Sequence, residues 1–131
     1  MDEPWKNEPD RVDFEHSGFP CILNRNDVGV WCGYAGVPRG HPAFGVNFAD
    51  LDEIDVHGGL TYSNECYGVI CRKVKEGETD DRFWLGFDCG HAWDYTPKLN
   101  LGPPSSYRSY KDINFARKET ESLAEQLSRM I

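Results

Sequence analysis

The sequence predicts an α+β domain, in which a mostly antiparallel sheet of four to six strands is covered on one side by a single C-terminal helix. Two observations predict this class. Short, apolar, β-prone runs flank polar turns along much of the chain, a pattern typical of antiparallel hairpins. A stripe of apolar residues at helical spacing then closes the chain. Because such a stripe must be buried, we expect the helix to pack on the sheet.

Two hairpins are predicted. Residues 19–23 and 28–34 are apolar and enclose a polar turn, so they form the first hairpin. Residues 67–74 and 83–87 enclose a charged turn and form the second. Residues 54–62 resemble a short strand that is interrupted by two glycines. Together these segments supply the expected sheet.

The clearest helical pattern spans residues 112–129, with Asp112 as the expected N-cap. Apolar or small residues recur at spacings of three and four, which places them on one face. Ala116, Leu123 and Leu127 are therefore expected to be buried against the sheet. A coiled-coil dimer is the alternative, but the stripe spans fewer than about three heptads.

Length and composition limit the classes of function. A chain of 131 residues fits one domain, residues 1–131, and the unpatterned, charged residues 1–12 are expected to be a loose N-terminal arm. The net charge of −8 argues against general nucleic-acid binding. No apolar run is long enough to cross a bilayer and the N-terminus lacks a signal peptide, so we expect a cytoplasmic protein without a membrane partner, as a monomer or dimer. The five cysteines are expected to stay reduced.

Three short segments concentrate histidine, aspartate and glycine, around His41, His57 and His91. In the third, Asp88 and Asp94 flank His91 directly after a buried strand, where a rigid sheet can aim side chains. Imidazole and carboxylate groups together can bind Zn²⁺ or Mn²⁺. His57, His91 and Asp94 are the predicted metal ligands, and Asp88 and His91 the predicted catalytic groups. This assumes that the strand at 54–62 lies beside the strand at 83–87.

Two other interpretations of these residues remain open. In the first interpretation, the aspartates and histidines only form hydrogen bonds that stabilise the fold. In the second, an organic ligand binds without metal, through His41, His57, Trp93 and Tyr95, because aromatic rings in a loop suit the stacking of a flat group.

The cysteines offer a rival site. Cys66, Cys71 and Cys89 with His91 would form a Cys₃His zinc set, although two of these cysteines lie in or beside a predicted strand. Cys89 beside His91 would alternatively be a nucleophile next to its base. Buried free thiols are the default for this residue type.

Four segments of the chain, at 33–42, 56–63, 84–94 and 110–127, resemble small uncharacterised proteins of bacteriophages and prophages. The motifs VHGGLTYS (56–63) and GFDCGHxxD (86–94) carry this resemblance most specifically. It implies a phage or prophage origin and a bacterial host cytoplasm, but no activity.

Two functions follow as hypotheses. The first is a phage accessory protein that binds a host protein or small molecule through a site rich in histidine, aspartate and aromatic residues. The alternative is a small metal-dependent hydrolase, in which a metal held by His57, His91 and Asp94 activates water.

Overall fold

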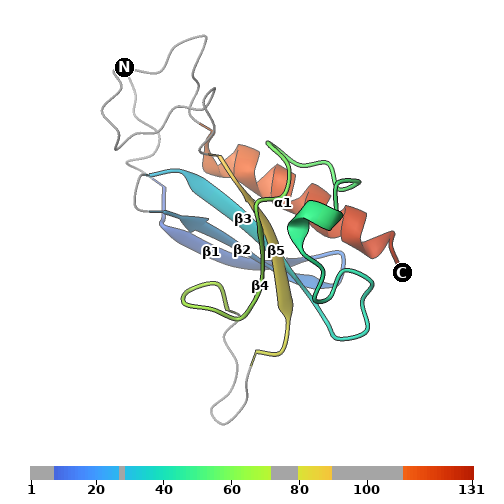
Figure 1. Ribbon diagram of the computed structural model, residues 1–131. Coiled ribbons are helices and arrows are strands. Elements are labelled where there is room, and N and C mark those ends of the chain that lie inside the picture. Colours follow the sequence, from blue (N-terminus) through green and yellow to red (C-terminus); the bar gives the residue numbers. More distant parts are fainter. Residues whose placement is uncertain (1–7, 27–28, 72–79, 90–110) are drawn as a thin grey trace.

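The computed structural model describes residues 8–26, 29–71, 80–89 and 111–131. Within these ranges it has a five-stranded antiparallel sheet and one C-terminal α-helix, so the predicted α+β class is confirmed (Figure 1). The described part of the chain contains no helix long and apolar enough to cross a bilayer. The elements are β1 Arg11–His16, β2 Phe19–Arg25, β3 Trp31–Val37, the 3₁₀ turn η2 Phe48–Asp50, β4 Tyr62–Glu65, β5 Phe83–Asp88 and α1 Ile113–Ser128.

The strands are ordered β1-β2-β3-β5-β4, and every neighbouring pair is antiparallel. The predicted first hairpin is confirmed, because β2 pairs with β3 and Ile22 lies opposite Tyr34. The predicted second hairpin is wrong, since β5 pairs with β3 and β4, while Tyr67 and Ile70 form only an isolated bridge.

The strand expected at 54–62 is also wrong for most of its length, because β4 begins only at Tyr62. Gly58 and Gly59 have φ values of 70° and 80°, which an extended strand does not adopt. The two glycines therefore turn the chain before it joins the sheet, and β4 reaches β5 through residues that follow them.

The first strand, β1, had no counterpart in the predicted elements. It begins at Arg11, inside the segment expected to be a loose arm, and its residues alternate between the two faces of the sheet. Ser17 and Gly18 join it to β2 with φ values of 53° and 86°. Positive φ at both positions is the geometry of the tight turns that match the twist of a hairpin.

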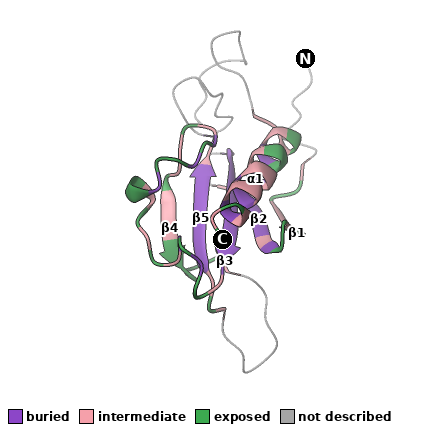
Figure 2. Ribbon diagram, turned by 90° about the vertical axis from the view of Figure 1, so that its right-hand side faces the viewer, coloured by how far each residue is buried: buried purple, intermediate pink, exposed green. Residues whose placement is uncertain are grey.

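The helix α1 covers one face of the sheet, as predicted (Figure 2). Leu123, Leu127 and Ala116 are fully buried, and Asp112 caps the helix by accepting a hydrogen bond of 2.9 Å from the Phe115 amide. Gly33 of β3 lets the helix approach, because a Cβ there would lie 2.1 Å from Oγ1 of Thr120. The main core lies between α1 and this face.

The face of the sheet away from α1 is called the second face below. Two large rings lie on this face, and each packs over a glycine of the adjacent strand. Trp84 packs over Gly36, and Tyr34 packs over Gly86. A Cβ at Gly86 would lie 2.3 Å from the Tyr34 ring, so the glycines make room for the rings. These rings, with Ile22, Cys32 and Ile70, form a second buried cluster.

The cysteines differ from expectation, because Cys66 and Cys71 form a disulfide. The turn between them brings their Cα atoms to 4.8 Å, which is within disulfide range, and an odd number of cysteines does not prevent one local pair. Cys21, Cys32 and Cys89 are buried thiols that take no part in a disulfide, as expected for this residue type.

Candidate functional site

The predicted metal site cannot be assembled from the described residues. His91, Trp93, Asp94 and Tyr95 lie outside them, in the range 90–110. The metal-dependent hydrolase and its shared Zn²⁺ or Mn²⁺ ion therefore stay predictions. The described members of the predicted sites are His41, His57 and Asp88.

His41 is buried and both of its ring nitrogens have backbone partners. Nδ1 accepts a hydrogen bond of 2.9 Å from the Ala43 amide, and Nε2 lies 2.8 Å from the Leu127 carbonyl oxygen. Because an amide can only donate, the ring must carry its proton on Nε2 and donate it to Leu127. His41 thus fastens the connection after β3 to the end of α1.

His57 lies on the helix side of the molecule. Its ring meets Phe115 of α1 edge-on, with centroids 5.1 Å apart, and its amide donates to Oε1 of Glu119 at 2.7 Å. Asp88 lies at the end of β5 opposite Cys32, on the second face, where its Oδ2 accepts a hydrogen bond of 3.0 Å from Thr61. The structure therefore gives His57 and Asp88 contacts in different layers.

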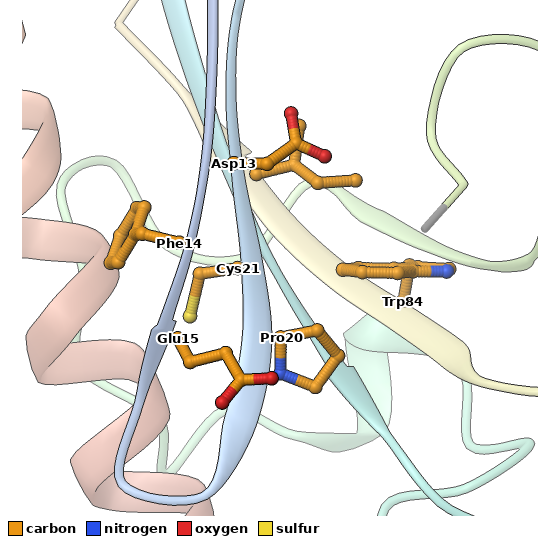
Figure 3. Close-up of a pocket in the computed structure, with 7 residues that line it drawn as sticks. Asp13, Phe14, Glu15, Pro20, Cys21 and Trp84 are labelled. Atoms are coloured by element: carbon orange, nitrogen blue, oxygen red, sulfur yellow. The ribbon is translucent and has the colours of Figure 1, made fainter. Parts of the chain in front are cut away.

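A cavity of about 510 Å³ lies on the second face, toward the edge of the sheet where β1 and β2 lie (Figure 3). The register explains its lining, because Asp13 lies opposite Ile22 and Glu15 opposite Pro20, so all four side chains share this face. Figure 3 shows Phe14 pointing toward α1 and the Trp84 ring on the other side of the strands. The described lining residues are Asp13, Phe14, Glu15, Pro20, Cys21, Ile22 and Trp84.

The cavity combines an apolar floor with an acidic rim. Ile22 and Trp84 are almost completely buried and form the floor, whereas Asp13 and Glu15 are exposed. Arg11 pairs with Asp13 at 2.7 Å, but Glu15 makes no ion pair with any described residue. The rim therefore carries unbalanced negative charge beside apolar surface, which suits a ligand with both an apolar and a cationic group.

Asp13 and Glu15, which line this cavity, are not among the site residues predicted from the sequence. The signal was present in the alternation of charged and less polar residues along 11–16, which is typical of a strand with one face in the core. Their association with Trp84 depends on strand order, and local patterns do not specify it.

Comparison with protein-family models, with curated proteins and with solved structures finds no significant match to this chain. The function must therefore be inferred from its own residues.

Two thiols in the sheet are strongly protected from ionisation. Burial raises the pKa of Cys21 to about 12, and burial raises that of Cys32 to about 11, with the charge of Asp88 adding to the effect. Although Cys21 contributes to the cavity lining, its side chain belongs to the core under α1. Neither thiol is therefore available as a nucleophile near neutral pH.

We expect these thiols to make the protein sensitive to alkali. A raised pKa favours the neutral thiol in the folded state, so its contribution to stability is complete below the ordinary thiol pKa of 9.0. This contribution should be lost as the pH rises from about 9 through about 11. Urea unfolding across this range should show falling stability, and Cys32→Ala should flatten the decline. An unchanged slope in Cys32→Ala would contradict the assignment.

Proposed function

We propose that this protein is a binding protein, and that its ligand is a small organic cation held in the cavity on the second face. The observation that carries the proposal is the position of Glu15, a carboxylate without an ion-pair partner among the described residues, at the rim of a floor made by Trp84 and Ile22. The chain's net charge of −8 would also draw cations toward it.

The dimensions of the cavity support such a ligand. Its volume of about 510 Å³ falls within the usual range for small-molecule sites, roughly 300–1,000 Å³. An ammonium or guanidinium group would pair with Glu15, and the attached alkyl or aromatic group would displace water from Pro20 and Trp84. The basic side chain of a partner protein has the same chemistry.

The biological setting belongs to the same proposal. On the resemblance to phage and prophage proteins, the ligand would be a molecule of the bacterial host, bound in its cytoplasm. A binding protein needs no catalytic group at the cavity, and the thiol of Cys21, which contributes to the lining, is protonated near neutral pH.

Phenethylamine and its neutral analogue 2-phenylethanol test the proposal, because the two compounds differ chiefly in charge. Calorimetric titration of the full chain should show that the amine binds more tightly. Glu15→Gln should weaken amine binding by about 2- to 5-fold, the effect of losing an exposed ion pair, and should leave the alcohol unaffected. Glu53→Gln is the matched control, because it removes the same charge from an exposed residue that does not line the cavity.

Two results would contradict the proposal. One is equal binding, or no binding, of the amine and the alcohol. The other is an equal loss of amine affinity in Glu15→Gln and Glu53→Gln, which would reduce the effect to the net charge of the whole protein.

A further inference from the structure

Three groups with metal-ligand chemistry lie together beside the second face, two on the turn at residues 66–71 and one at Asp80, just before β5. One ligand atom each of Cys66, Cys71 and Asp80 lies within 4.8 Å of the other two. The two sulfurs are joined in the disulfide, and Cys66 is exposed while the other two residues are half-buried. A reductant can therefore reach the bond from solvent.

The backbone of this turn has supports besides the disulfide. Tyr67 and Ile70 form a bridge, and the Ile70 side chain is buried in the cluster with Trp84. The guanidinium of Arg11 donates hydrogen bonds to the carbonyl oxygens of Val69 and Cys71, the latter at 2.9 Å. Because these contacts do not involve the sulfurs, we expect the turn to keep both cysteines close together after reduction.

The side chain of Asp80 is oriented by two hydrogen bonds from residues 82 and 84. Its Oδ2 accepts a hydrogen bond of 2.9 Å from the Trp84 indole, and its Oδ1 accepts one of 3.1 Å from the Arg82 amide. Each carboxylate oxygen can accept more than one partner, so these contacts leave capacity for a metal. Such supporting hydrogen bonds commonly fix the ligands of metal sites.

We propose that the reduced chain binds one Zn²⁺ through Cys66, Cys71 and Asp80, with water as the fourth ligand. A dithiol reductant would break the sulfur–sulfur bond, giving two protein thiols and the oxidised, cyclic disulfide of the reductant. Each protein thiol would then lose a proton on binding the metal. Thiolate and carboxylate are both established zinc ligands, and a spacing of four residues between cysteines occurs in zinc sites.

This site differs from the Cys₃His set considered from the sequence. Cys89 is almost completely buried in the core beneath α1, on the opposite side of β5 from Trp84. The side chain of Asp80, which bonds to the Trp84 indole, replaces it as the third ligand. Cys66 and Cys71 alone would hold the metal less firmly, since each ligand adds to its affinity.

Cobalt titration of the full chain tests the proposal. With a phosphine reductant and without oxygen, we expect one Co²⁺ per chain, a sulfur-to-cobalt charge-transfer band and the visible bands of tetrahedral cobalt, all removed by Zn²⁺. The oxidised protein should bind none. Cys66→Ser and Cys71→Ser should each diminish the charge-transfer band and weaken binding by about 10-fold or more, and Asp80→Asn should weaken binding while preserving the band.

Asp81→Asn and Cys89→Ala are the matched controls and should bind Co²⁺ as the unmodified protein does. The circular dichroism signal of α1 shows whether each variant is folded. If Asp80→Asn fails to fold, Cys66→Ser still tests the proposal, because Cys66 is exposed and its substitution should not disturb the core. The proposal is overturned if the folded, reduced chain takes up no Co²⁺ or shows no thiolate band. It is equally overturned if Cys89→Ala abolishes binding.

Discussion

Leu123→Ala is expected to lower the free energy of unfolding by about 2–5 kcal/mol. Leu123 is fully buried in the core between α1 and the sheet. The helix cannot move inward to fill the space left by the missing methyl groups, because Thr120 already touches the backbone of β3 at Gly33. A cavity should therefore remain and add to the lost burial. Urea unfolding followed by circular dichroism measures the change.

Ile131→Ala is the control for this prediction, since that side chain is 84% exposed and should change stability by less than about 0.5 kcal/mol. A loss below about 1 kcal/mol in Leu123→Ala would mean that α1 is not packed on the sheet as described.

Trp84→Ala is expected to cost about 3–5 kcal/mol of stability. The ring is fully buried on the second face, lies on Gly36 and donates from its indole nitrogen to Asp80. Its removal would open a void beside the cavity and leave one hydrogen bond of Asp80 unmade. The same change should abolish phenethylamine binding, because the floor of the proposed site is lost.

Trp84→Phe separates the two contributions of this residue. It keeps most of the buried ring but removes the hydrogen bond to Asp80, so the expected loss is about 1–3 kcal/mol. Both losses are measured by urea unfolding. An alanine variant as stable as the phenylalanine variant would show that packing of the ring contributes little on the second face.

The helix and the first hairpin were predictable because their signals are local. The stripe through Leu123 and Leu127 has helical spacing, and the runs on either side of residues 24–27 specify a hairpin without any distant partner. The partner of β5 was not predictable in this way. Its neighbours β3 and β4 are determined by long-range packing. The strand expected at 54–62 does not form over most of its length, because the chain turns at Gly58 and Gly59.

The cavity on the second face was not among the predicted features, for a related reason. The sequence identified the end of β5, and Asp88 lies there on the second face, but the His57 ring contacts Phe115 of α1. The cavity depends on two registers, Asp13 opposite Ile22 and Gly36 opposite Trp84, that join distant parts of the chain. No local pattern contains that information. The disulfide does not follow from the number of cysteines, because it depends on the turn that brings the Cα atoms of Cys66 and Cys71 to 4.8 Å.

The central claim, that the cavity on the second face binds an organic cation, is tested most directly by mapping where phenethylamine binds. Titration of ¹⁵N-labelled protein should shift the amide signals of Asp13, Glu15 and Ile22 and the indole signal of Trp84 more than any in α1. The neutral alcohol should shift them less at the same concentration. Largest shifts in α1 or around Thr61 and Asp88, or no shifts at all, would contradict the claim.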